Sequence, residues 1–422
     1  MSNGLYLETA FAIGARLCRD AIWDGHRCNW LGEASENVDG EFKTIPKTQG
    51  WELYSGTSGV ALFLSQLYRQ AGEEIVREVA EGALRHALSR YQDVASDGRM
   101  SLFSGWTGLA HACLDLGDST GDERWHQRGL EILSETAKGD VDDQMLDVVI
   151  GLAGALPAVL NAYHRHGGDH LLDFAQRIGE SILARGHERP EGMSWDTLPD
   201  VVRDHLNGFS HGTSGMAWAL LELFNTNQDS RFRDAALAGF RYERHWYSPQ
   251  HGNWPDLRDD EKLHAGRPGV TPRPVNAEPL YPTLWCHGAP GIGMARLRAW
   301  ELLENEEVHE DLQNALRTTI ADLRNPHSES PNYSLCHGRA GNADLLIEAA
   351  QVLNESSYQA LAEEVGQRGI YTFEQRNQPW PSGLLGAPET PSLMVGVAGT
   401  GYFYLRLADP TTPSILLPVA RR

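Results

Sequence analysis

The most regular feature of the chain is the alternation of two apolar patterns. In residues 73–94, apolar side chains recur at three- and four-residue spacing with charged residues between them, which predicts an amphipathic helix. Residues 216–224 and 345–353 are instead apolar on nearly every side, which predicts helices buried between other elements. Sustained apolar–polar alternation is missing from the sequence, so we expect few and short strands.

Further segments of the amphipathic kind separate the apolar ones. They are residues 5–23, 169–186, 231–247, 308–324 and 358–375. The two patterns together predict a chain of helices in which an amphipathic helix and a buried helix follow each other repeatedly.

A Gly-x-x-Gly pair stands before each apolar segment and occurs seven times. The pairs are Gly56/Gly59, Gly105/Gly108, Gly151/Gly154, Gly212/Gly215, Gly288/Gly291, Gly338/Gly341 and Gly396/Gly399. Their first glycines follow one another at intervals of 49, 46, 61, 76, 50 and 58 residues. One such pair means little, but seven in the same position predict seven repeats of a two-helix unit.

Seven amphipathic and seven buried helices in alternation predict an all-α fold, an (α/α)7 double toroid. The helices that follow the glycine pairs would form the inner ring, with all seven pairs at one end around a central cavity. Because the repeats run through the whole chain, we expect residues 1–422 to form a single domain. Residues 248–282 are rich in proline and lack helical periodicity, so we expect an irregular insertion loop over the cavity mouth.

The charge balance excludes some classes of partner. The chain has 36 Lys and Arg against 57 Asp and Glu, a formal charge of −21, which argues against binding nucleic acid or an anionic membrane surface. A peptide partner is compatible with this charge. Neither an uninterrupted apolar signal region nor a membrane-spanning stretch is found, so we expect a cytoplasmic protein without membrane insertion.

Reactive side chains directly precede two of the glycine pairs. Cys286 and His287 precede the fifth pair, and Cys336 and His337 precede the sixth. If the pairs converge, these side chains converge as well. Two thiolates and one imidazole suit Zn²⁺ and leave a fourth position for water or substrate. The spacing alone leaves open whether His287 or His337 supplies the imidazole.

A histidine without a neighbouring cysteine precedes the fourth pair. This residue, His211, is typical of a general acid or base rather than a metal ligand. Asp147 stands four residues before the third pair, where its carboxylate could orient or charge His211.

The motifs around these residues resemble the LanC-like family of lanthionine synthetase cyclases. SHGTSG at 210–215, WCHGAPGIG at 285–293 and LCHGRAGN at 335–342 carry the resemblance, together with the seven glycine pairs. It covers essentially the whole chain. WCHGAPGIG, the closing SLMVGVAGTGYFYLRL and AIWDGHRCNW at 21–30 look most like the C-terminal cyclase domain of class II (LanM-type) lanthipeptide synthetases.

The resemblance implies a zinc enzyme with assigned site residues. It places zinc on Cys286, Cys336 and His337, and the catalytic pair on His211 and Asp147. His287 would lie next to a zinc ligand in a supporting or substrate-side role. The implied reaction is an intramolecular Michael addition, in which Cys thiols of a precursor peptide add to dehydroalanine or dehydrobutyrine and form (methyl)lanthionine thioether rings.

The implied partners are a dehydrated leader–core precursor peptide and a separate dehydratase protein or domain, since we expect no dehydratase domain in this chain. Two other functions remain open: a LanC-like enzyme that adds glutathione to dehydroamino acids, and a non-catalytic, zinc-containing peptide-binding module. A toroid glycosidase is disfavoured, because it needs paired catalytic carboxylates and only Asp147 is well placed.

Overall fold

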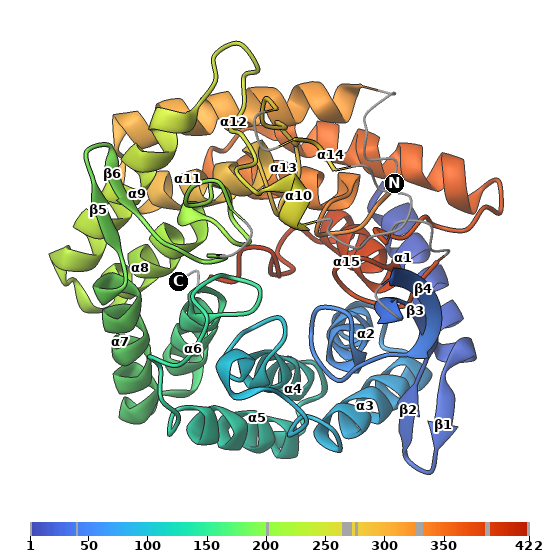
Figure 1. Cartoon of the computed structure of the whole chain (residues 1–422). Coiled ribbons are helices and arrows are strands. Elements are labelled where there is room, and N and C mark those ends of the chain that lie inside the picture. The colour runs from blue at the N-terminus through green and yellow to red at the C-terminus, as the bar shows by residue number, and fades with distance from the viewer. Residues whose placement is uncertain are drawn as a thin grey trace.

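Helices form two concentric rings in the computed structural model, which describes residues 2–38, 41–199, 202–263, 272–274, 277–325, 332–384 and 389–419 (Figure 1). The inner ring consists of α2 (Thr57–Ala71), α4 (Trp106–Thr120), α6 (Leu152–His166), α8 (Thr213–Asn227), α11 (Ala289–Leu303), α13 (Arg339–Val352) and α15 (Val397–Ala408). The outer ring consists of α1 (Ser2–Asp20), α3 (Glu74–Leu88), α5 (Glu123–Thr136), α7 (Asp169–Ala184), α9 (Ser230–Trp246), α12 (Glu306–Arg324) and α14 (Ser356–Gly369).

The inner ring closes on itself, and the outer helices pack around it. Each inner helix contacts the next one, and α15 contacts α2. Each outer helix packs against the inner helix that precedes it, and α1 completes the set by packing on α15. The predicted (α/α)7 toroid is therefore confirmed, and all seven glycine pairs lie at the starts of inner helices.

Burial follows the two sequence patterns. In α8, every residue from 213 to 223 is buried, as expected for a helix enclosed on all sides. In α7, buried Leu171, Phe174, Ile178 and Ile182 recur along one face, which is the face turned to the core.

The boundaries differ from the sequence prediction in places. The first amphipathic helix ends at Asp20, and Trp23 lies in a strand instead. The helical segment predicted to end at residue 375 changes to a π-helical turn at Ile370–Glu374. Helix α5 was not among the predicted amphipathic segments, although it buries Trp125, Ile132 and Leu133.

The described residues also form three antiparallel two-stranded sheets. They pair β1 (Ile22–Asp24) with β2 (Arg27–Asn29), β3 (Leu31–Val38) with β4 (Glu41–Thr48), and β5 (His187–Arg189) with β6 (Gly192–Ser194). The register of the second sheet runs from Leu31 opposite Thr48 to Val38 opposite Glu41. Its eight-residue strands are longer than expected, because their sequences show little apolar alternation.

The predicted insertion loop, 248–282, is described at 248–263, 272–274 and 277–282. These parts contain the four-residue helix α10 (Asp260–Leu263) and isolated bridges such as Asp256 with Leu280. Residues 264–271 and 275–276 of this loop lie outside the described residues. That the whole loop covers the cavity mouth, and that the chain is one domain, stay predictions.

A close approach of backbone to backbone explains the second glycine of each pair. A Cβ built at these seven positions would lie 1.8–2.3 Å from the carbonyl oxygen six residues earlier. At Gly341, for example, this atom is the Leu335 oxygen, 1.8 Å away. The loop before each inner helix therefore folds directly onto the first helical turn, where only glycine leaves enough room.

Backbone hydrogen bonds join all seven loops at that end of the barrel. The N–H groups of Tyr54, Met394, Cys336, Cys286, Ser210 and Val148 donate, in this order, to the carbonyls of Phe103, Tyr54, Met394, Cys336, Cys286 and Ser210, at 2.8–3.3 Å. Each donor therefore belongs to a different glycine-pair loop from its acceptor. We call this series the backbone chain.

A buried ionic cluster anchors the fourth loop to the helices behind it. Oε1 of Glu243 in α9 accepts hydrogen bonds from the backbone N–H groups of Gly208 and Ser214 at 2.8 and 2.9 Å. Its Oε2 pairs with Arg296 of α11 at 2.9 Å, and both side chains are fully buried. Arg296 also reaches Asp311 of α12 at 3.3 Å.

Among the helices that the structure describes, none has the length and apolar character needed to cross a membrane.

We expect Glu243→Gln to destabilise the protein by about 3 kcal/mol, because the buried Arg296 loses half of its neutralising charge. Urea unfolding followed by circular dichroism measures this change. The exposed pair of Lys138 and Glu135 provides the control, and Glu135→Gln should leave the unfolding midpoint unchanged. Equal midpoints for both variants would show that the cluster is not needed for stability.

Candidate functional site

A cavity of about 340 Å³ lies where the seven loops converge. Most of its lining occupies the two positions directly before a glycine pair. Tyr54, Val149, Ser210, Cys286 and Cys336 stand two residues before the first glycine, and His211, His287 and His337 stand one residue before it. Arg258 and Leu284 complete the lining. The repeat thus places side chains from five loops around one space.

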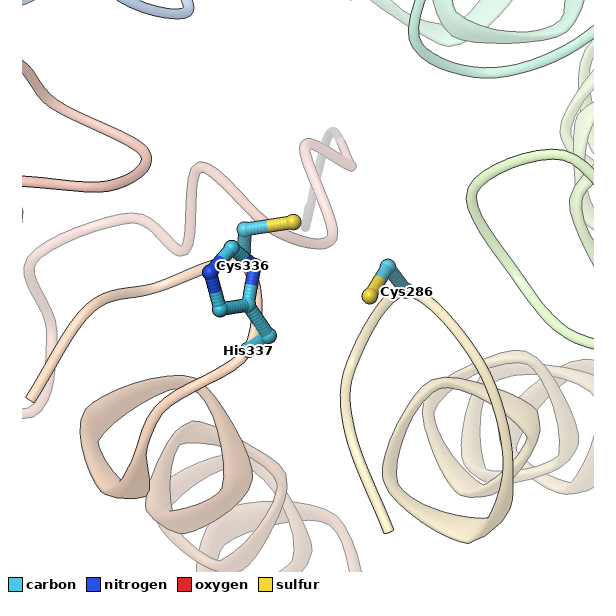
Figure 2. Close-up of side chains that lie close together, drawn as sticks. All are labelled: Cys286, Cys336 and His337. Carbon is cyan, nitrogen blue, oxygen red and sulfur yellow. The ribbon is translucent and has the colours of Figure 1, made fainter. Parts of the chain in front are cut away.

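Cys286, Cys336 and His337 form a cluster in this cavity. The two sulfur atoms and a ring nitrogen all lie within 4.8 Å of one another, and Figure 2 shows both sulfurs between the two loops. In the part of the chain that the structure describes, no other group of three such side chains meets this condition. Two thiolates and an imidazole are the donor set of a soft or borderline metal ion, so the residues present fit such an ion.

The structure distinguishes the two histidines that the spacing left open. His337 belongs to the cluster, whereas His287 does not. Nε2 of His337 donates a hydrogen bond to the Gly383 carbonyl at 2.6 Å. The lone pair for a metal ion then resides on Nδ1. Such a hydrogen bond fixes the tautomer and the orientation of a ligating imidazole.

The pKa values of the two thiols are shifted in opposite directions. The Cys336 sulfur accepts hydrogen bonds from the Cys286 thiol and from the Tyr54 hydroxyl. Although burial alone would raise the pKa of Cys336, these hydrogen bonds hold it below its usual value. The same contact with Cys336, together with burial, raises the pKa of Cys286. Cys336 is therefore the thiol that ionises first, and Cys286 would release its proton when a cation binds.

His211 and Asp147 form a hydrogen-bonded pair at the cavity wall. Nδ1 of His211 lies 2.7 Å from Oδ2 of Asp147, whose side chain is fully buried. The other oxygen of Asp147 accepts the backbone N–H of Ile150 at 2.6 Å, which holds the carboxylate in place. Burial works against a charged imidazole, but Asp147 outweighs it and raises the pKa of His211.

His287 is buried beside this pair. Its ring centroid lies 5.9 Å from that of His211. Burial, and the neighbouring positive charge of Arg258, lower the pKa of His287 to about 3. It is therefore a neutral imidazole at physiological pH, next in sequence to Cys286, and its supporting or substrate-side role stays a prediction.

Several residues at the site were not singled out from the sequence, among them Tyr54, Gly383 and Arg258. Tyr54 stands two residues before the first glycine pair, the position that Cys286 and Cys336 hold in theirs, so aligning the repeats could have found it. Gly383 and Arg258 lie outside the repeated positions, and no pattern marks them.

The chain is similar to known proteins in sequence and in structure. The model of the family described as lanthionine synthetase C-like protein matches residues 47–417. The lacticin 481/lactococcin biosynthesis protein LcnDR2 of Lactococcus lactis subsp. lactis is 24% identical over 211 residues, which cover 49% of this chain and 21% of that protein. The match therefore spans about a fifth of that relative's length.

Among solved structures, nisin cyclase superposes with a TM-score of 0.65 at 16% identity. The superposition covers 86% of this chain and 89% of nisin cyclase. At this level of identity, the likeness shows that the two chains share a fold.

We expect Gly383→Ala to weaken binding of added Zn²⁺ by about 10- to 100-fold, the usual effect of disturbing the support of a metal ligand. A Cβ at this position would lie 2.5 Å from Nε2 of His337, so the imidazole must move. Competition with a colorimetric chelator measures the affinity. Gly98→Ala is the control, since a Cβ there meets nothing within 4 Å. Unchanged affinity in Gly383→Ala would exclude His337 as a ligand held by this carbonyl.

Proposed function

The chain belongs to the lanthionine synthetase C-like family, and on that premise we propose that it is a zinc-dependent lanthionine cyclase. In the proposed reaction, Cys thiols of a precursor peptide add to dehydroalanine or dehydrobutyrine residues of the same peptide and form thioether rings. One observation supports this function above the others. The Cys286–Cys336–His337 cluster and His211, which is hydrogen-bonded to the buried Asp147 behind it, meet at a single cavity.

The three clustered side chains would hold the metal ion. With three protein donors, one coordination position stays open. A bound Zn²⁺ would supply a site for the substrate thiol and favour its thiolate form at neutral pH.

His211 would supply the proton that completes the addition. When the substrate sulfur bonds to Cβ, the electron pair of the double bond moves toward the amide carbonyl, and Cα must then take up a proton. The raised pKa of His211 favours its protonated form, and Asp147 holds Nδ1, so that Nε2 is the nitrogen left for the substrate. This favours the acid role over the base role that the sequence left open.

The substrate class follows from the same chemistry. The acceptor double bonds arise from Ser and Thr by elimination of water, so we propose that a dehydratase, on a separate protein or domain, prepares the leader–core peptide. The alternative is that glutathione supplies the thiol. A peptide that contains dehydroalanine but no cysteine, incubated with glutathione and the protein, tests this alternative. Formation of a glutathione adduct without ring formation on a cognate peptide would favour that alternative.

We expect the wild-type protein to bind about one zinc ion per chain, and Cys336→Ala to lose both the metal and ring formation. Elemental analysis measures the metal, and mass spectrometry after thiol alkylation counts the free cysteines that remain in a dehydrated peptide. Cys18→Ala, which changes a cysteine in α1 outside the cavity, should retain both properties. Rings formed at the wild-type rate by metal-free Cys336→Ala would refute the zinc-dependent mechanism.

We expect His211→Asn to retain the metal and lose about 10²- to 10⁴-fold in cyclisation rate, the usual contribution of a general acid. Because an acid must be protonated, the rate should fall as pH rises through the pKa of His211. Asp147→Asn removes the group that raises this pKa, so the cyclisation rate of that variant should begin to fall at a lower pH than that of the wild type.

Rates of ring formation between pH 5 and 9 measure both effects. A shift of the Asp147→Asn profile to higher pH would indicate that His211 is not the acid. Loss of metal in His211→Asn would instead make His211 a ligand.

A further inference from the structure

Arg258 also lines the cavity, and it belongs neither to the Cys286–Cys336–His337 cluster nor to the His211–Asp147 pair. Arg258 lies in the described part of the 248–282 segment, whereas most of the other lining residues come from the loops before the glycine pairs. It shares the cavity with Cys286, Cys336 and His211. An arginine carries its charge at all physiological pH values and offers five N–H donors. The cavity therefore combines a thiol site, an acid and a fixed positive charge.

Asp256 holds the guanidinium from one side. Nε of Arg258 lies 3.0 Å from both carboxylate oxygens of Asp256, and Nη2 lies 2.5 Å from Oδ2. The backbone N–H of Arg258 also donates to Oδ1 at 3.0 Å. Although burial disfavours the charged form, His287 and Arg258 lower the pKa of Asp256 to about 2. The pair is therefore fully ionised.

Backbone contacts fix the segment that carries this pair. The N–H of Asp256 donates to Leu280 O at 2.8 Å, and the N–H of Arg203 donates to Leu257 O at the same distance. Among the described residues, Nη1 of Arg258 has no hydrogen-bond partner. The guanidinium is thus oriented through Nε and Nη2, while Nη1 keeps its donors for a ligand.

The position of this charge is unfavourable for the neighbouring acid. Arg258 works against protonation of His211 and of His287. The positive charge is better matched to negative charge, and it interacts favourably with the Cys286 and Cys336 sulfurs. A cation in this place is understandable if negative charge develops in the cavity during the reaction.

We propose that Arg258 binds the amide carbonyl oxygen of the dehydroamino acid and stabilises the negative charge that this oxygen gains during addition, an inference that rests on the proposed cyclase function. The S–Cβ bond forms as the electron pair of the Cα=Cβ bond shifts toward the carbonyl, leaving an enolate oxygen next to Nη1. Transfer of the His211 proton to Cα restores the carbonyl. The thiol proton released on substrate binding balances the proton that His211 takes back from solvent.

Arg258→Met tests this role, because it keeps most of the side-chain length and removes the donors. We expect unchanged zinc content and a cyclisation kcat lowered about 10²- to 10³-fold, the usual loss of one oxyanion donor. Alkylation of a non-dehydrated peptide thiol by iodoacetamide needs the same thiolate but no amide acceptor, so its rate should stay unchanged. Arg258→Ala should regain part of the lost rate when ethylguanidinium is added.

Arg189→Met is the matched control, since Arg189 pairs with Asp204 at 3.3 Å, is also partly exposed and does not line the cavity. It should cyclise like the wild type. An equal fall of alkylation and cyclisation in Arg258→Met would show that Arg258 acts on the thiol, and a change of KM alone would show a simple binding contact. Either result overturns the proposal, as does loss of zinc.

Two outcomes distinguish the cyclase function from the role of Arg258. Wild-type protein that forms no rings on any dehydrated peptide overturns the cyclase function and the role of Arg258 with it. Wild-type-like cyclisation by Arg258→Met overturns only the role of Arg258.

Discussion

The hydrogen bonds of the backbone chain are the interaction on which the rest of the site depends. They run between residues two or three positions before each glycine pair and join loops that are up to 340 residues apart in sequence, as Met394 N–H to Tyr54 O shows. In five of the seven loops, side chains one or two positions before the glycine pair then line the central cavity. The geometry of the cavity is therefore set by main-chain groups, which every residue type except proline supplies.

The Cys286–Cys336–His337 cluster follows directly from this arrangement. The Cys286 N–H donates to the Cys336 carbonyl, so the two cysteines are neighbours in the backbone chain and their sulfurs meet. The Ser210 N–H donates to the Cys286 carbonyl, which brings His211 to the next place around the cavity. Behind these loops, the Glu243–Arg296 cluster holds the fourth loop against α9 and α11. His211 and the three clustered side chains are thus positioned by one continuous framework.

Much of this could be predicted from the sequence because the repeat is both structural and chemical. The glycine pairs predicted the toroid, and Cys286, Cys336 and His211 were found because they adjoin those pairs. His287 and His337 hold equivalent places in their repeats, so the spacing could not separate them. The family resemblance pointed to His337, and the distances to sulfur and the Gly383 carbonyl single out the same residue. Arg258 could not be predicted as a site residue, because it lies in a segment without periodicity. In such a segment, the spacing of residues does not indicate which of them lie close together in space.

The residues that line the cavity are not those that build the barrel. The second glycines and the buried faces of the inner helices determine the architecture, while equivalent places before the pairs carry groups as different as Val149, Ser210 and Cys286. Such a scaffold tolerates an exchange of reactive groups without a change of topology. The seven repeats therefore offer equivalent places around one axis, and a point substitution at one of them can change the chemistry of the cavity while the glycine contacts that hold the loop are kept.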